Sequence, residues 1–246
     1  MGKPILEIQD LSVEVSGKRI LNDVNLQICE GEVHVLFGPN GSGKSSLIMA
    51  ILGFPAYKVV SGKILFKGRD ITSLPTNERV KMGIGVAFQN PPAIRGVKLG
   101  GILSRLTPNE EKINELLRKV KIPSSFLERD VNLGFSGGEI KKSEVLQVLA
   151  QNSDFLILDE PDSGVDVENL RVLGTVINEA LQGRSALIIT HLGVILQYIN
   201  ANIAHVLMNG TIVCSGNPTR ILGQILNEGY AWCEKCPKVK TLRCEL

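Results

Sequence analysis

The sequence predicts an α/β protein with a mixed central sheet, an antiparallel β layer and a helical lobe. Short apolar segments alternate with amphipathic helical segments, which is the pattern of a parallel sheet covered by helices. The N-terminal segments instead alternate apolar and polar residues, as half-buried antiparallel strands do. Because a mostly helical stretch interrupts this order, we expect one core from residues 1–90 and 153–246, and a helical lobe from residues 91–152.

The antiparallel layer comes first in the chain. Ile5–Gln9 and Leu11–Val15 alternate apolar and polar residues, and Ile20–Ile28 does so again after a turn at Ser16–Lys18. Val33–Phe37 is apolar almost throughout, which predicts a central strand buried on both faces.

The remaining elements follow from the same periodicities. Apolar residues three and four positions apart indicate the helices, and Pro91-Pro92 breaks the pattern before the helical lobe. Strands are expected at 63–66, 85–88, 155–158, 186–189 and 203–207, and helices at 44–52, 76–81, 110–120, 139–149, 167–181 and 192–199.

Composition excludes several classes of function. Lysine and arginine number 27 against 25 acidic residues, so the net charge of +2 gives no strong field to attract nucleic acid. We see no signal-like N-terminal segment and no apolar run of about 18 residues, so we expect no direct membrane insertion. Five cysteines in such a chain suit a reducing cytoplasm.

A glycine-rich segment joins the strand at 33–37 to the helix at 44–52. Its sequence, Gly38-Pro39-Asn40-Gly41-Ser42-Gly43-Lys44-Ser45 followed by Ser46, fits the pattern G-x-x-x-x-G-K-[ST] in the strand–loop–helix context that phosphate binding requires. The glycines let backbone N–H groups face phosphate oxygens, and the helix adds its positive end. We expect Lys44 to reach the β- and γ-phosphates of a nucleotide and Ser45 to bind Mg²⁺.

Two adjacent acids, Asp159 and Glu160, follow the apolar strand at 155–158. Alone they would be an ordinary polar strand end, but the glycine-rich loop supplies a phosphate for them to face at the carboxyl edge of the sheet. We expect Asp159 to hold Mg²⁺ through water. Glu160 is expected to orient and deprotonate the attacking water.

A second phosphate-receptive segment opens the helix at 139–149. In Ser136-Gly137-Gly138-Glu139 the serine suits an N-cap, and two glycines precede the helix. An ordinary capped helix start has the same residues, so only the other motifs give this one meaning. Because one chain cannot sensibly present both segments to one γ-phosphate from opposite sides, we expect a head-to-tail pair. Each chain's Ser136 segment would close over the other's glycine-rich loop.

Two further polar residues end neighbouring strands. His191 follows the strand at 186–189, and although a lone histidine is often structural, this edge lets it reach a γ-phosphate. Gln89 ends the strand at 85–88, where it can contact Mg²⁺ or water and act as a hinge to the helical lobe.

The other histidines and the cysteines favour plainer interpretations. Expected core residues are His34, His205, Cys29 and Cys214, which lie in apolar strand-like segments. Cys233, Cys236 and Cys244 have a spacing that metal or redox sites use, but no fourth ligand is evident, so a metal site there stays an alternative.

Taken in order, these motifs resemble those of the ATP-binding-cassette (ABC) ATPase family across nearly the whole chain. Phe135–Glu139 resembles the family's signature, with Phe and Glu where Leu and Gln are commoner. Ser163–Asp166 resembles its D-loop and adds Asp166 to the nucleotide-binding residues. The resemblance implies the P-loop NTPase fold of ABC ATPases, with ATP sandwiched in a dimer and hydrolysed there.

A narrower resemblance is to SufC, the soluble ABC ATPase of iron–sulfur cluster assembly. It rests on Gly31–His34, Ala87–Gln89, Asn132–Glu139, Asp162–Asp166, His205–Leu207 and Gly229–Trp232. Like SufC proteins, the chain has Val15 where most ABC ATPases place an aromatic residue on adenine, so weaker apolar contact with the base is expected. The region from Gly96 to Lys119, where partners would dock, looks shorter than in bacterial SufC, and the cysteine-bearing tail extends past the family's usual end.

The SufC resemblance implies a cytoplasmic ATPase that forms a transient, ATP-dependent homodimer and drives a shape change in a SufB/SufD-type scaffold. The alternative is the ATP-binding subunit of a membrane ABC transporter, because the core motifs fit both. A third hypothesis, a subunit that senses ATP without turnover, is disfavoured by the complete set of expected catalytic residues.

Overall fold

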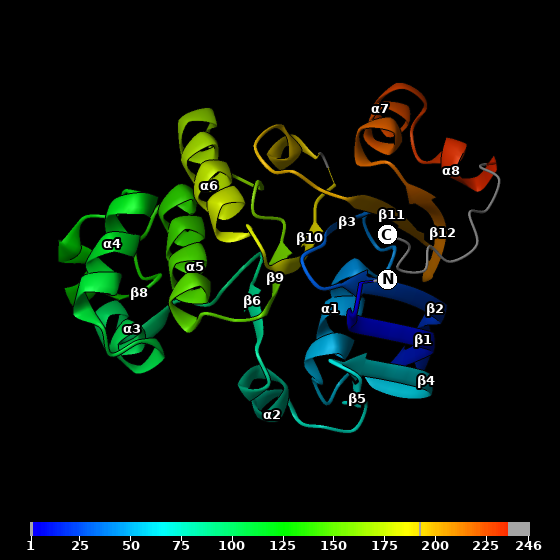
Figure 1. Ribbon diagram of the computed structural model, residues 1–246, viewed down its shortest axis with the longest axis horizontal. Coiled ribbons are helices and arrows are strands. Elements are labelled where there is room, and N and C mark those ends of the chain that lie inside the picture. Colours follow the sequence, from blue (N-terminus) through cyan, green and yellow to red (C-terminus); the bar gives the residue numbers. More distant parts are fainter. Residues whose placement is uncertain (1, 192, 236–246) are drawn as a thin grey trace.

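The computed structural model describes residues 2–191 and 193–235. Its centre is a six-stranded sheet in the order β12-β11-β3-β10-β9-β6, parallel except for the edge strand β12 (Figure 1). The strands are β3 (Val33–Phe37), β6 (Ile84–Ala87), β9 (Phe155–Asp159), β10 (Ser185–Ile189), β11 (Ile203–Met208) and β12 (Thr211–Gly216). The predicted mixed central sheet is therefore confirmed, and all five residues of β3, β9 and β10 are buried, as their apolar sequences require.

The antiparallel layer is a four-stranded sheet in the order β2-β1-β4-β5. Its strands are β1 (Pro4–Val15), β2 (Lys18–Cys29), β4 (Lys58–Phe66) and β5 (Arg69–Asp70). The two strands expected between residues 5 and 15 are one strand of 12 residues. The register with β2 shifts between Ile8 and Leu11, and Asp10 has a φ of 47°, so an irregularity within the strand takes the place of the expected break.

Helices cover both faces of the central sheet. They are α1 (Lys44–Leu52), α2 (Thr76–Lys81), α3 (Leu99–Leu106), α4 (Glu110–Val120), α5 (Gly137–Gln151), α6 (Val167–Ala180), α7 (Pro218–Glu228) and α8 (Ala231–Lys235), with 3₁₀ turns η1 (Ser124–Glu128) and η2 (Val194–Gln197). Side-chain caps start several of them: Asn109 accepts from Lys112 N–H before α4, and Asp166 accepts from Asn169 N–H before α6.

Two hydrophobic clusters sandwich the sheet. One joins α1 to the antiparallel layer and to sheet residues such as Leu36 and Ile157. The other joins sheet residues on the opposite face, such as Val35 and Leu158, to α5, α6 and α7. Because alternate residues of each buried strand enter different clusters, the sheet fixes the glycine-rich loop and the strand-end acids relative to one another.

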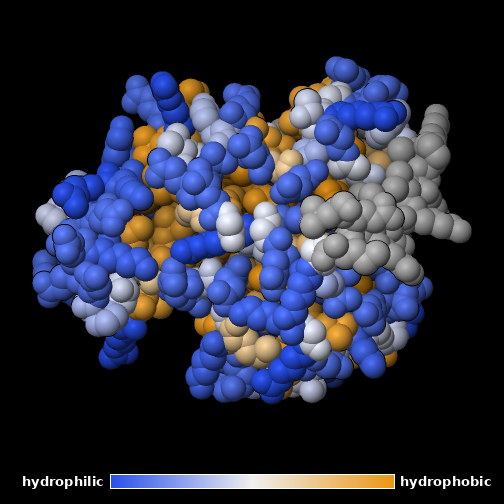
Figure 2. Space-filling model, viewed as in Figure 1, coloured by the Kyte–Doolittle hydropathy of each residue, from blue (hydrophilic) through white to orange (hydrophobic). Residues whose placement is uncertain are grey.

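Residues between β6 and β9 form a helical region that extends to one side of the sheet (Figure 1). It contains α3, α4 and α5 together with an unexpected two-stranded sheet of β7 (Ile94–Lys98) and β8 (Asp130–Val131). In β7 every residue is exposed, which explains why burial periodicity did not reveal it. The face of the molecule that Figure 2 shows is mostly hydrophilic, and hydrophobic side chains gather in the recess beside these helices.

One expected helix is wrong. Residues 192–199 were predicted to be helical, but the structure has only the 3₁₀ turn η2 over Val194–Gln197. Gly193, with a φ of 66°, precedes it and donates its N–H to Thr190 Oγ1, so local turn bonds replace the start of an α-helix. None of the described helices is long and apolar enough to cross a membrane.

Candidate active site

The glycine-rich loop lies between β3 and α1, where the sequence predicted it. Gly41 and Gly43 have φ angles of 77° and 108°, in the left-handed region that favours glycine. A Cβ on Gly43 would lie only 2.8 Å from Leu21 Cδ2, so the loop is packed tightly onto β2. Glycine at these positions therefore sets both the turn and its close approach to the neighbouring layer.

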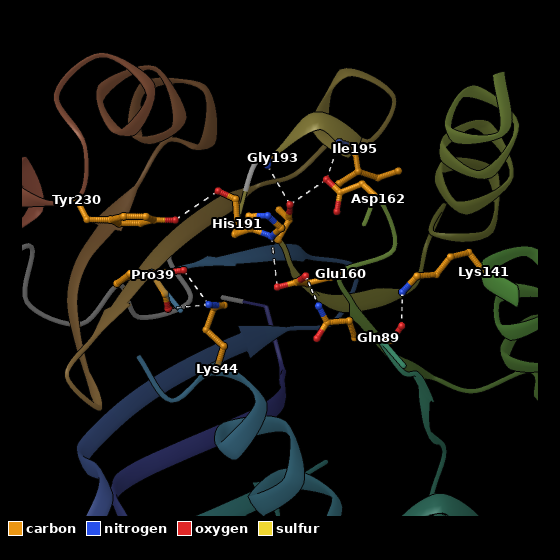
Figure 3. Close-up of polar contacts among 12 residues, drawn as sticks. Pro39, Lys44, Gln89, Lys141, Glu160, Asp162, His191, Gly193, Ile195 and Tyr230 are labelled. Atoms are coloured by element: carbon orange, nitrogen blue, oxygen red, sulfur yellow. Dashed lines mark hydrogen bonds and ion pairs between the residues drawn. The ribbon is translucent and has the colours of Figure 1, made fainter. Parts of the chain in front are cut away.

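Lys44 begins α1 and is nearly buried. Its ammonium donates to the carbonyl oxygens of Gly38 at 2.7 Å and Pro39 at 3.0 Å (Figure 3). Burial lowers the pKa of Lys44, although the nearby carboxylates of Glu160 and Asp159 oppose that effect. The loop thus encloses a positive charge beside two acids.

A cavity of about 480 Å³ opens over the loop. This volume is within the range of small-molecule sites, about 300–1,000 Å³. It is lined by Ile20, Asn40, Gly41, Gly43, Lys44, Ser45, Ser46, Gln89, Glu160, Ser163 and His191. The structure therefore brings together most of the loop residues, Gln89, Glu160 and His191, as the sequence predicted; Gly38, Pro39 and Ser42 belong to the loop but do not line the cavity.

Glu160 is the centre of the polar contacts in this cavity. Gln89 Nε2 donates to Glu160 Oε2, and His191 Nδ1 lies 3.4 Å from Glu160 Oε1 (Figure 3). These three side chains come from the ends of β6, β9 and β10, which are adjacent in the sheet. The Glu160 side chain is 9% exposed and lines the cavity. Gln89 and His191 contact its carboxylate from two sides.

Asp159 lies beside Glu160 but is buried and does not line the cavity. Burial raises its pKa to about 6, the repulsion of Glu160 adds to this, and the ammonium groups of Lys141 and Lys44 oppose it. Lys141, from α5, also donates to the Gln89 carbonyl oxygen at 2.7 Å. The two acids are therefore neighbours in a poorly solvated environment. The ammonium groups of Lys44 on α1 and Lys141 on α5 partly offset their negative charge.

The segment Ser136–Glu139 lies elsewhere. Ser136 caps α5 in a reciprocal capping box, in which Glu139 Oε2 accepts from Ser136 N–H at 2.7 Å. None of the four residues lines the cavity, and neither does Asp166, which caps α6. A Cβ on Gly137 would lie 3.1 Å from the Gly164 carbonyl oxygen, so this segment packs beside the D-loop of its own chain.

Sequence reasoning missed several residues of the site. Ile20 and Ser163 line the cavity, and Lys141 and Tyr230 bond to the backbone of Gln89 and His191. Lys141 had a usable signal, since it stands on the helix that Ser136 opens. Tyr230 lies in the segment Gly229–Trp232 that resembles SufC, but nothing in the sequence predicted its contact with His191, because contact between segments 39 residues apart is set by the fold.

The residues around this cavity fit a nucleoside triphosphate with Mg²⁺. Ser42 Oγ, buried in the loop, has no hydrogen-bond partner within the part of the chain that the structure describes. Ser45 lines the same cavity as Gln89 and Glu160. Mg²⁺ prefers oxygen ligands and takes few from the protein when phosphates supply the others, and these side chains offer oxygen.

Comparison with known proteins identifies the family. The family model described as ABC transporter matches residues 21–163, which span the glycine-rich loop, Ser136–Glu139 and the Asp159-Glu160 pair. The chain belongs to the ABC ATPase family. It therefore binds nucleotide and is an ATPase. The glycine-rich loop is called the P-loop from here on.

Relatives extend this similarity over most of the chain. The "Probable ATP-dependent transporter ycf16" of Trieres chinensis is 40% identical, covering 93% of this chain and 97% of that protein. The "Iron-sulfur cluster assembly protein SufC" of Plasmodium falciparum is 42% identical over 93% of this chain and 71% of that protein. Among solved structures, a nucleotide-free ATP-binding cassette from an ABC transporter superposes with a TM-score of 0.78 at 26% identity, covering 96% of this chain and 100% of that one.

The predicted ABC ATPase fold is thus confirmed, and so is the resemblance to SufC. Of the three cysteines named as an alternative metal site, only Cys233 lies within the described residues. Cys233 is buried on α8, whereas Cys236 and Cys244 lie outside the described residues. His34 and His205 are core residues, as expected, and are hydrogen-bonded to each other at 2.9 Å.

Proposed function

We propose that this ABC ATPase hydrolyses Mg·ATP at a site shared by two copies in a head-to-tail dimer, and that hydrolysis drives a shape change in a SufB/SufD-type scaffold during iron–sulfur cluster assembly. The cytoplasm is the proposed location. The single observation that carries the shared site is that the catalytic candidates gather around one cavity, while the phosphate-receptive segment Ser136–Glu139 is outside it.

The cavity residues have roles that follow from their positions. Glu160 accepts the proton of the attacking water, and its bonds to Gln89 and proximity to His191 hold the carboxylate in place. Lys44 and the P-loop N–H groups bind the phosphates. Mg²⁺, held by Ser45, Gln89 and, through water, Asp159, would offset charge on the phosphates.

The second copy completes the other side of the phosphate. Ser136, Gly137 and Gly138 stand at the positive end of α5, a 15-residue helix, so this N-terminus suits the γ-phosphate of a facing chain. The capping box uses the Glu139 carboxylate and the Ser136 N–H, which leaves the Ser136 O–H to donate to the nucleotide. Asp166 is exposed beside this segment and would lie at the same interface.

The scaffold role is supported by relatives and by the helical region. Two apolar side chains of β7 are exposed there, Ile94 at 39% and Val97 at 38%. Ile94 precedes the region from Gly96 to Lys119 and Val97 lies within it, and β7 begins five residues after Gln89 in the chain. A partner bound here would therefore act on the strand end that holds Glu160.

A pull-down of the tagged protein from native cytosol under anaerobic conditions tests the partner. Stoichiometric recovery of non-membrane scaffold proteins carrying iron–sulfur cluster or its precursors is expected. The second candidate function is the ATP-binding subunit of a transporter, which the name of the Trieres relative favours. Recovery of a protein with several membrane-spanning helices would establish that function and contradict the first.

The role of Glu160 has a separate test. Glu160→Gln keeps the hydrogen-bonding shape but cannot accept the proton, so ATP binding should be retained and turnover reduced at least about a hundredfold, the lower end of general-base catalysis. Phosphate release and equilibrium binding of a fluorescent ATP analogue measure the two effects. Lys44→Ala serves as the complementary variant and should lose ATP affinity; hydrolysis at the wild-type rate by Glu160→Gln would refute the assignment.

A further inference from the structure

The segment after α7 reaches the nucleotide-binding edge of the sheet. Gly229 has a φ of 71°, a conformation that favours glycine, and it turns the chain out of α7. Tyr230 and Trp232 then pack against the hydrophobic cluster on the α6 and α7 face of the sheet. The Cys233 N–H bonds to the Tyr230 carbonyl at 3.0 Å and starts α8. The ring of Tyr230 is thereby held against this cluster.

The Tyr230 hydroxyl joins two loops of the active site. It donates to the His191 carbonyl oxygen at 3.4 Å (Figure 3). The backbone of Gly38 also interacts with this hydroxyl. Gly38 follows β3 and His191 follows β10, and these strands are neighbours in the sheet. The hydroxyl therefore bridges the start of the P-loop and the loop that carries the histidine.

The Gly38 end of this bridge is fixed. A Cβ on Gly38 would lie 2.3 Å from the Leu207 carbonyl oxygen, so the backbone there is in close contact with β11. Gly38 also accepts a bond from Lys44 at 2.7 Å. Gly38 cannot shift without disturbing the P-loop. The Tyr230 hydroxyl therefore fixes the position of His191 relative to the P-loop.

The histidine loop is held on its other flank by Thr190. Its hydroxyl accepts from Gly193 N–H and donates to Asp162 Oδ2, both at 2.9 Å. Those bonds hold Thr190 and Gly193, whereas Tyr230 acts on the carbonyl of His191 itself. The backbone that carries the imidazole is therefore held from two directions, and the imidazole is 36% exposed and 3.4 Å from Glu160.

The phenol is suited to remain a donor. Burial raises the pKa of the Tyr230 hydroxyl, and the Gly38 backbone bond opposes this only in part. The proton therefore stays on the oxygen at any pH near neutrality, and the bridge does not titrate there.

We propose that Tyr230 is a positioning residue for ATP hydrolysis: its hydroxyl bridges Gly38 and His191 and so sets the place of the His191 imidazole beside Glu160. The inference rests on the proposed role of His191. It predicts that the C-terminal segment contributes to turnover although it does not line the cavity.

Tyr230→Phe tests the bridge, because it keeps the ring and removes only the hydroxyl. We expect kcat to fall about threefold to tenfold, the value of one net hydrogen bond, while KM and ATP affinity stay within about twofold. Tyr57→Phe is the matched control, since Tyr57 packs against the other hydrophobic cluster and does not line the cavity, and it should leave kcat unchanged. An unchanged kcat in Tyr230→Phe overturns the proposal.

A double-mutant cycle separates positioning from general stabilisation. In a His191→Ala background, Tyr230→Phe should cause no further loss of kcat, because the hydroxyl acts through the missing imidazole. Equal loss in both backgrounds would show a merely structural role and contradict the proposal. If His191→Ala alone keeps the wild-type kcat, the proposed role of His191 is what fails, and the two failures are distinguishable.

A measurement on the unaltered protein does not depend on folding of the variant. Trp232 is the only tryptophan and lies two residues from Tyr230, so its emission reports on this segment. Saturating Mg·ATP should shift that emission, since the phosphates bind the loop that Tyr230 contacts. Emission that is identical with and without Mg·ATP would contradict the coupling.

Discussion

Asp159 lies in an environment that opposes its charge. Its pKa of about 6 in the folded chain lies above the 3.8 of an ordinary aspartate, so between these values the folded protein holds the proton more tightly than the unfolded chain does. Its contribution to the stability of the nucleotide-free protein should therefore fall as pH rises from about 4 to about 6, by up to about 3 kcal/mol, and stay level above that.

Asp159→Asn should remove this contribution. The variant is expected to be more stable than the wild type at pH 7 and to lose that advantage toward pH 4, as measured by urea unfolding across the range. Asp154→Asn, at the other end of β9 and paired with Lys67 on the surface, is the control and should show no such trend. Parallel stability curves for Asp159→Asn and the wild type would mean that burial of this carboxyl carries no penalty.

Single residues also show where sequence reasoning reached its limit. His34 and His205 were expected in the core from their apolar strands, but their mutual bond depends on β3 and β11 being adjacent. Gln89, Glu160 and His191 could be predicted, because each ends a parallel strand. Tyr230 could not, since its contacts come from a segment whose path no local pattern describes.

At the scale of elements, the start of α5 has two separable functions. Ser136→Ala should cost about 1 kcal/mol of stability through loss of the N-cap. Asn109→Ala, which removes the cap of α4, should cost a similar amount, since Asn109 makes the same kind of bond at 3.0 Å.

Only one of these two variants should lose ATP turnover. If Ser136 faces the nucleotide of a second chain, Ser136→Ala lowers the steady-state hydrolysis rate well beyond any change in Asn109→Ala, with urea unfolding as the check on stability. Equal rates in the two variants would indicate that Ser136 is a helix cap and nothing more.

Elements whose residues are periodic and buried were predicted well, and exposed ones were not. The strands β3, β9 and β10 have continuous apolar sequences and were placed within about one or two residues, the usual uncertainty of such boundaries. The exposed β7 has no alternation that burial would impose. The helix expected over 192–199 failed because its apolar residues serve a 3₁₀ turn whose bonds to Thr190 and Asp162 arise only in the folded protein.

For the whole molecule, the fold class followed from the order of motifs, but the shared site did not follow from composition or periodicity. The split between core at 1–90 and 153–246 and lobe at 91–152 stays a prediction. What distinguishes this arrangement physically is that the P-loop cavity and the Ser136 segment are separate surfaces of one chain. In a head-to-tail pair the P-loop cavity of each chain faces the Ser136 segment of the other. Because such a dimer is symmetric, it contains two of these shared sites.

The most direct test of the shared site mixes two inactive variants. Lys44→Ala breaks the P-loop side, and Ser136→Glu places an anion opposite the γ-phosphate. In a mixed dimer both defects meet in one site, and the other site has an intact P-loop and an intact Ser136. If the account is right, an equal mixture, assayed with whatever scaffold co-purifies, should recover up to about a quarter of the wild-type ATPase rate, as random pairing allows. A rate that stays at the mean of the two separate variants would contradict a site built from two chains.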